Sequence, residues 1–223
     1  MSIDTFLLLL VGFGLGLMHA LDADHIMAVS VLNSQKTSIK RTLVQSGRWA
    51  LGHGGMLLCC GILLFGVGVP IPESIQKTAE MSVGVLLIVL GVMCVIRIRK
   101  DKLTFERHSH GDIVHAHWYE NTHAHTTKHS HKPVFVGMLH GLAGSAPALA
   151  LIPAVANGQF MPAMLYLVIF SLGVMLSMLF FGLGFAHIQQ FLSRRSHVIF
   201  QLSRHGLALS SIALGSYWLL QAS

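Results

Sequence analysis

The stretch that decides the fold is His19-Ala-Leu-Asp-Ala-Asp-His25, which lies inside an otherwise apolar segment. Between residues 6 and 31 no other charged residue and no other histidine occurs. Ionisable side chains at membrane depth are costly and by default mark functional sites. Imidazole and carboxylate groups are ligands of divalent transition metals. The stretch therefore predicts a metal or proton site within a membrane helix.

The backbone conformation decides which of these side chains meet. On an unbroken helix His19, Asp22 and His25 share one face, because residues three apart are neighbours, and Asp24 points away. An unwound segment would let all four converge. A structural salt-bridge cluster is the alternative interpretation, but no lysine or arginine lies in this segment to pair with the carboxylates.

The composition indicates an integral membrane protein. The 223 residues are 53% hydrophobic and only 11% charged, with a mean hydropathy of +0.64, whereas soluble domains carry about 25% charged residues. Apolar runs close to the length of a membrane span recur along the chain. We predict an all-α, multi-pass protein of the cytoplasmic (inner) membrane with six transmembrane helices, at residues 5–31, 47–69, 79–97, 134–156, 162–187 and 203–221. The first of these is long enough to tilt or to break near its polar centre.

The distribution of basic residues predicts the orientation. Fourteen of the 15 lysines and arginines fall in the segments after the first, third and fifth spans, and Lys77 is the exception. The positive-inside rule places these segments in the cytoplasm and both termini outside it. The net charge of +6 is thereby explained without nucleic acid, and we expect the lipid bilayer, not nucleic acid, as the partner. No basic region precedes the first apolar run, so we expect a retained membrane segment there rather than a signal peptide.

The chain contains an internal repeat. Gly16-Leu-Met-His-Ala-Leu21 aligns with Gly137-Met-Leu-His-Gly-Leu142, which sets His19 opposite His140. Weaker matches follow in the same order in the later spans. Three spans per half require inverted topology, a plan of secondary transporters whose site lies near the midplane. We therefore divide the chain into a first three-helix repeat at 1–97, a His-rich cytoplasmic loop at 98–132 and a second repeat at 133–223.

Two further histidines lie within predicted spans. His53 sits in Leu-Gly-His-Gly-Gly of the second span, and His140 is the repeat mate of His19. A lone membrane histidine is often only hydrogen-bonded between helices, so that interpretation stays open for both. Ser145 follows His140 and could add a hydroxyl. The predicted metal site comprises His19, Asp22, Asp24, His25, His53 and His140.

The loop at 98–132 carries a second, weaker set of candidate metal ligands. Its histidines form His-x-His pairs, and such tracts bind metal ions reversibly. A flexible pH-sensitive linker is the alternative, because histidine titrates near neutrality. Lacking apolar periodicity, the loop is expected to have no fixed fold. The residues are His108, His110, His115, His117, His123, His125, His129 and His131.

The sequence argues against an enzyme and against a prosthetic group. Cys59, Cys60 and Cys94 all lie in the first half, whereas a thiol-electron carrier built from two repeats would need a cysteine in each. No His-Glu-x-x-His metalloprotease motif or Gly-x-x-x-x-Gly-Lys nucleotide-binding motif occurs. Energy for transport would therefore come from a gradient or from a partner protein.

These motifs resemble those of the nickel/cobalt transporter family. The pattern His-x-x-x-x-Asp-His, here His19 to His25 followed by Ile26, is similar to that family's hallmark, and Leu51-Gly-His53 is similar to its next motif. The best-known members have eight spans and an Asp-Thr-Ala-Thr-Glu run, which this chain lacks. His140-Gly-Leu-Ala-Gly-Ser-Ala146 stands in its place and resembles the branch of urease-accessory-type membrane proteins and nickel/cobalt efflux proteins.

The resemblance implies a secondary transporter whose substrate is a nickel or cobalt ion, with the histidines and aspartates of the first motif required for transport. The abundance of histidine and the His-Gly-Leu-Ala-Gly motif favour efflux. The alternative is nickel uptake that supplies urease or hydrogenase maturation, with a cytoplasmic metallochaperone as candidate partner. A membrane metal sensor or a redox protein without transport is a second alternative.

Overall fold

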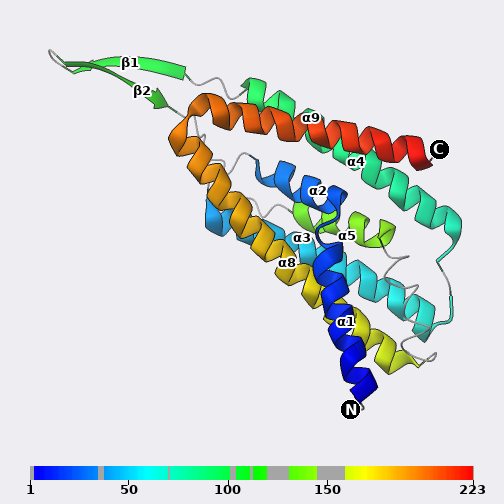
Figure 1. Cartoon of the computed structure of the whole chain (residues 1–223). Coiled ribbons are helices and arrows are strands. Elements are labelled where there is room, and N and C mark those ends of the chain that lie inside the picture. Colours follow the sequence, from blue (N-terminus) through cyan, green and yellow to red (C-terminus); the bar gives the residue numbers. More distant parts are fainter. Residues whose placement is uncertain are drawn as a thin grey trace.

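We describe a computed structural model of the chain, which covers residues 3–34, 38–69, 71–100, 104–110, 113–119, 131–144 and 159–222. Its membrane part is built of helices, and the described strands form one hairpin (Figure 1). The helices are α1 (Ile3–His19), α2 (Ala23–Asn33), α3 (Ile39–Gly61), the π-helical turn η1 (Ile62–Gly66), α4 (Glu73–Lys100), α5 (Lys132–Ala143), α8 (Phe160–Arg195) and α9 (His197–Ala222). The strands are β1 (Thr104–His110) and β2 (Ile113–Tyr119).

Several of these helices are long and apolar enough to cross a membrane. In the described residues three helices meet this test, at Ile39–Gly66, Glu73–Arg99 and Phe160–Arg195, and the bent pair Leu9–His19 plus Ala23–Asn33 is a possible fourth span. The chain is therefore a multi-pass membrane protein. The six predicted spans are not all matched: α9 is helical but too polar to pass, and α5 has only 12 residues. The rest of the predicted fourth span lies outside the described residues.

The first predicted span is broken at its polar centre, which is one of the two arrangements, tilting or breaking, that its length allows. α1 ends at His19, α2 begins at Ala23, and the two axes differ by 55°. Asp22 adopts an extended conformation, with φ −59° and ψ 144°, so the helix cannot continue through it. The break turns residues 19–25 away from a single helical stripe and lets His19 and His25 approach from two directions.

Small residues bring the helices together. α1 packs on α8, α3 packs on α5 and α8, and α4 packs on α9. A Cβ atom on Gly16 would meet the carbonyl oxygen of Phe170, and one on Gly52 would meet that of Val134. Such close backbone approach is typical of membrane helix interfaces, where tight packing replaces the hydrophobic effect.

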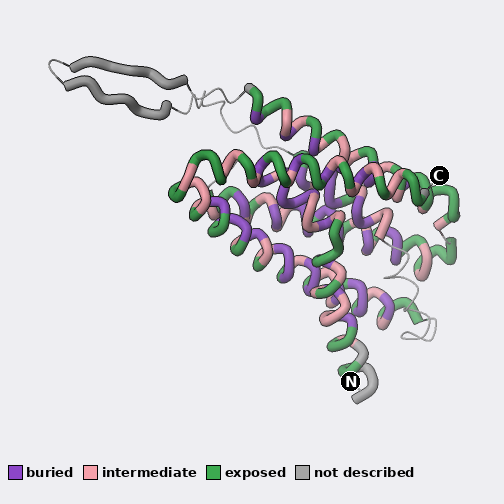
Figure 2. The backbone as a smooth tube through the Cα atoms, turned by 45° about the horizontal axis from the view of Figure 1, so that its top comes forward, coloured by how far each residue is buried: buried purple, intermediate pink, exposed green. Residues whose placement is uncertain are grey.

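Buried residues lie where the helices face one another, and exposed residues lie on the outside (Figure 2). Many of the exposed residues are large and apolar. The fully buried core includes Trp49, Leu57, Leu87 and Tyr166. Large apolar residues such as Val85, Val89, Val92, Phe180 and Leu209 are exposed on the outside. An apolar exterior around a tightly packed interior is the surface that a bilayer solvates.

The expectation that the 98–132 loop has no fixed fold is wrong for part of it. β1 and β2 pair as an antiparallel hairpin in which His108 is opposite His115. Phe105, Ile113, Val114, Trp118 and Tyr119 supply the aromatic and β-branched residues that strands favour. Gly-Asp between the two strands is a hairpin-turn sequence. The many histidines drew attention away from the strand-forming residues, which lie between them in the sequence.

Candidate metal centre

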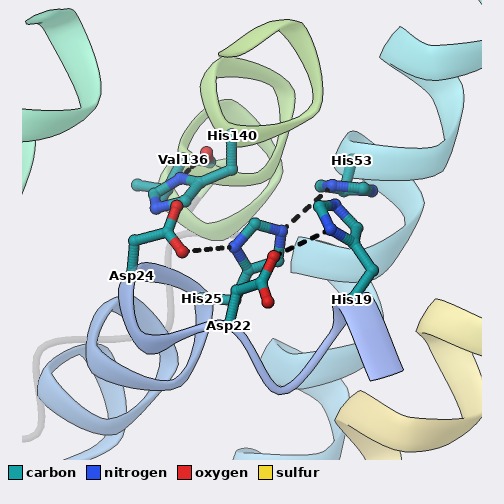
Figure 3. Close-up of polar contacts among 7 residues, drawn as sticks. All are labelled: His19, Asp22, Asp24, His25, His53, Val136 and His140. Atoms are coloured by element: carbon teal, nitrogen blue, oxygen red, sulfur yellow. Dashed lines mark hydrogen bonds and ion pairs between the residues drawn. The ribbon is translucent and has the colours of Figure 1, made fainter. Parts of the chain in front are cut away.

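Three histidines from three helices converge at the break in the first span. His19 is the last residue of α1, His25 lies in the first turn of α2, and His53 lies in the middle of α3. One ring nitrogen from each lies within 4.8 Å of the other two. His25 and His53 are almost completely buried, and only 13% of the His19 side chain is exposed. We call these residues the three-histidine group (Figure 3).

The spacing within this group suits a metal ion. The Nε2 atoms of His25 and His53 lie 3.2 Å apart. Two nitrogen ligands that each sit about 2.0–2.1 Å from one ion are themselves roughly 2.9–3.4 Å apart. The ring centroid of His19 is 4.7 Å from that of His25 and 5.3 Å from that of His53. The three rings are therefore close enough for one nitrogen of each to share an ion.

The two aspartates of the motif hold the imidazole rings from behind. Asp22 Oδ2 lies 2.9 Å from His19 Nδ1, and Asp24 Oδ1 lies 3.0 Å from His25 Nδ1. A carboxylate accepts, so each Nδ1 donates the proton and each neutral ring keeps a lone pair on its Nε2. Carboxylates that orient metal-binding histidines in this way are a general feature of metal sites. In the described residues no lysine or arginine forms an ion pair with either aspartate, which argues against the salt-bridge alternative.

His140 lies beside the three-histidine group but is not part of it. Its Nδ1 donates to the carbonyl oxygen of Val136 at 2.8 Å, and its ring centroid is 5.3 Å from that of His25. Its Nε2 is therefore also left with a lone pair. The structure thus brings all six predicted residues together, with three at the centre, two carboxylates behind them and His140 at the side.

Several of these buried nitrogens have no partner among the described residues. They are His19 Nε2, His53 Nδ1 and His140 Nε2. A buried polar atom without a hydrogen bond costs about 1–3 kcal/mol, and three such atoms in one small region demand an explanation. A bound cation would engage the lone pairs of His19 and His140 directly. The donor set therefore fits a divalent metal.

Comparisons with known proteins show to which family the chain belongs. A family model described as the cytochrome c biogenesis protein transmembrane region matches residues 8–212. The chain is 30% identical over 180 residues to the urease accessory protein UreH of Bacillus sp. (strain TB-90), which covers 81% of this chain and 76% of that protein. The chain belongs to the nickel/cobalt transporter family.

A second relative is the high-affinity nickel transport protein of Cupriavidus necator (strain ATCC 17699 / DSM 428 / KCTC 22496 / NCIMB 10442 / H16 / Stanier 337). It is 26% identical over 112 residues, which cover 47% of this chain and 32% of that protein. The chain thus spans about a third of this relative. No solved structure matches the chain.

Two aromatic residues that the sequence analysis missed form walls of the metal centre. The Trp49 ring stacks on His53 at 5.3 Å between centroids and meets His25 and His140 edge-on. Phe170 lies 5.5 Å from His19. Both could have been found: Trp49 lies one turn before His53 on α3, and the repeat that pairs His19 with His140 also pairs Trp49 with Phe170. Their rings fix the imidazoles and keep water away.

A cavity of ≈ 410 Å³ opens onto the metal centre of this family member. It is lined by the motif residues together with residues of α4, α5 and α9. Glu80 of α4 and Trp218 of α9 were not predicted as site residues. The sequence gives no sign that these two residues lie beside the motif, because both are far from it along the chain.

The remaining predicted residues lie elsewhere. His131 precedes α5 and is exposed. His108, His110, His115 and His117 are on the hairpin, whose side chains are outside the description, as are His123, His125, His129 and Ser145. The metal-binding role predicted for the loop therefore stays a prediction.

Proposed function

We propose that the protein is a secondary transporter that moves divalent nickel or cobalt ions across the cytoplasmic membrane. The observation that carries this proposal is the three-histidine group, buried between apolar helices at the break of a membrane span. Imidazole nitrogens are good ligands for nickel. Relatives named as a nickel transport protein and a urease accessory protein support the same class of substrate.

The side chains divide into ligands and supports. The Nε2 atoms of His19, His25 and His53 bind the ion after it sheds water, while Asp22 and Asp24 hold two of the rings in place. His140 joins when the helices shift, because its free Nε2 already faces the same region. The ion is cargo and not a prosthetic group, so the site must release it as readily as it binds it.

We propose that the chain comprises two inverted three-helix repeats, at 1–97 and 133–223, joined by the His-rich loop at 98–132. The helix contacts support this division. Gly16 meets Phe170 of α8, and its repeat mate Gly137 meets Trp49 of α3, which is the mate of Phe170. The first span of each half thus packs on the second span of the other half.

The third spans obey the same symmetry. On α4, Gly84 approaches the carbonyl oxygen of Gly215, and Gly91 approaches that of Ala208. When Gly91 is aligned with Gly215, Gly84 is aligned with Ala208. The contact between Gly84 and Gly215 is therefore the repeat mate of the contact between Gly91 and Ala208. With three spans in each half, such a two-fold relation inverts one half in the membrane. Rocking of one half against the other would expose the metal centre to each side in turn.

The orientation follows from the basic residues, with both termini extracytoplasmic and the hairpin loop in the cytoplasm. In this orientation the loop can collect ions for efflux, which the sequence favours, or receive imported ions for a metallochaperone that serves urease or hydrogenase. The relative named as a urease accessory protein supports the second direction. Flux measured from each side of the membrane decides between them.

A thiol-redox function is supported less well. The matching family model carries the name of a cytochrome c biogenesis region. Cys60 and Cys94 are buried and Cys59 is exposed, and none of the three belongs to the second half or to the metal centre. At the positions that the internal repeat aligns near the centre of the two halves, the chain has His19 and His140 and no cysteine. A metal sensor without transport is distinguished by binding without flux.

The experiment is nickel and cobalt flux in proteoliposomes that contain the full chain, the His19→Ala variant, or a variant with residues 101–131 replaced by a Gly/Ser linker. We expect metal-selective flux in the wild type, its loss in His19→Ala, and its retention in the loop variant. Metal binding without flux in the wild type would overturn transport and favour the sensor. Absence of both would overturn the metal function altogether.

A further inference from the structure

Glu80 lies on the wall of the cavity that leads to the three-histidine group. It belongs to α4, whereas the motif residues that line the same cavity belong to α1, α2 and the break between them. The Glu80 side chain is half-buried. In the described part of the chain it forms no ion pair, and Lys77, one turn earlier on α4, does not reach it.

An unpaired carboxylate at this depth needs a compensating charge. Partial burial of a charge near a bilayer is costly unless a partner or an ion offsets it. Among the described residues the cavity lining supplies no lysine or arginine, and its charged members there are Asp22, Asp24 and Glu80. All three carry negative charge, and a cleft of one sign concentrates ions of the other.

The second cavity on the same helices has the opposite character. It has a volume of ≈ 310 Å³, and its charged lining residues are Arg97 and Lys132. α2, α4 and α5 each contribute to both cavities, with different stretches of each helix at each one. A divalent cation is therefore attracted to the cavity that holds Glu80 and repelled from the other.

The first cavity is also large enough for a hydrated ion. Six waters at about 30 Å³ each occupy roughly 180 Å³, and the cavity has ≈ 410 Å³. Carboxylates accept hydrogen bonds from the waters of such an ion, so contact does not require dehydration. Asp22, with 54% of its side chain exposed, and Glu80 are the acidic groups best placed to meet it.

We propose that Glu80, together with Asp22, forms a capture point for hydrated divalent cations in this cavity, from which ions pass to or from the three-histidine group. This inference rests on the proposed transport function. Glu80 acts through its charge on the concentration and placement of the ion. It is not a ligand of the dehydrated ion at the three-histidine group.

The test compares nickel flux in proteoliposomes for the wild type, Glu80→Gln, Glu80→Asp and Glu73→Gln. Glu73 is the matched control, because it is an exposed glutamate of the same helix that does not line the cavity. We expect Glu80→Gln to raise the KM for nickel by about 3- to 10-fold at low ionic strength, with the maximal rate changed less than about two-fold. Glu80→Asp and Glu73→Gln should stay near the wild type.

Ionic strength separates a charge effect from a structural one. Because salt screens charges, the KM penalty of Glu80→Gln should shrink as salt rises, with the thermal midpoint unchanged. A KM equal to that of the wild type, or a loss of flux that salt does not alter, would overturn the inference. If Glu80→Gln does not fold, Glu80→Asp takes its place in the test. A KM of Glu80→Asp that responds to salt as that of Glu73→Gln does supports the inference. A raised KM of Glu80→Asp that salt does not change overturns it. Wild-type protein without nickel flux would instead overturn the proposed function.

Discussion

His25 and His53, which are 28 positions apart in sequence, face each other through their Nε2 atoms at 3.2 Å. Because Asp24 accepts the Nδ1 proton of His25, the Nε2 of His25 carries a lone pair, and the proton between the two rings belongs to His53. A cation that binds both rings must displace that proton to the Nδ1 of His53, which has no other partner in the described residues. Transfer of this one proton would therefore leave both Nε2 atoms able to bind the same ion.

His25→Ala and His53→Ala are each expected to abolish high-affinity nickel binding. Each substitution removes one of the two nitrogens that lie at the spacing of metal ligands. The loss of nickel affinity should therefore exceed the roughly 10- to 100-fold loss that follows removal of a residue that only hydrogen-bonds to a ligand. Isothermal titration of purified protein in detergent measures it. His187→Ala is the control, because His187 is exposed on α8 and bonds only its own helix. Wild-type affinity in either central variant would remove that residue from the site.

Asp24→Asn should weaken nickel binding by about 10- to 100-fold without abolishing it. An amide in this position can no longer stabilise the charge on a metal-bound imidazole, but it can still hold the His25 ring by accepting its proton. Asp22→Asn should have a smaller effect, because 54% of the Asp22 side chain is exposed against 14% for Asp24. Titrations of the two variants side by side check the order. A loss as complete as that in His25→Ala would make Asp24 a direct ligand.

The sequence predicts the place of the metal centre better than its internal geometry. The cost of four ionisable groups in an apolar run locates the candidate site, whereas the length of that run leaves both a tilted and a broken helix open. The division of labour between His25 and Asp24 could not be predicted, because it depends on the direction in which α2 leaves the break. That direction is set by packing against distant helices, which local propensity does not encode.

Tertiary contacts also explain which residues were missed. Glu80 and Trp218 reach the cavity only because α4 and α9 pack together beside α2. Glu80 lies at the start of the predicted third span, at residues 79–97, where an acidic residue at the end of a membrane helix is unremarkable. Trp49 could have been noticed from its helical spacing to His53, yet an aromatic residue in an apolar helix carries little information until its neighbours are known.

Gly52→Ala should destabilise the protein, whereas Gly55→Ala on the same helix should not. A Cβ on Gly52 would collide with the backbone of Val134 in α5, and a Cβ on Gly55 meets nothing within 4 Å. Overpacking of a tight interface costs about 1–3 kcal/mol. Thermal unfolding in detergent measures the difference. Equal midpoints for the two variants would contradict the close approach of α3 and α5.

The apparent affinity for nickel should fall as the pH falls. A histidine binds either a proton or the metal, so metal binding must release protons wherever the ligands are protonated. The Kd should therefore be higher at acidic pH than at neutral pH, because protons compete with the ion for the same nitrogens. Titrations in buffers of different ionisation enthalpy count the released protons. The comparison uses the variant that lacks residues 101–131, so that loop histidines do not contribute. A Kd that does not rise at any acidic pH at which the protein stays folded would contradict binding of the ion by the three histidines.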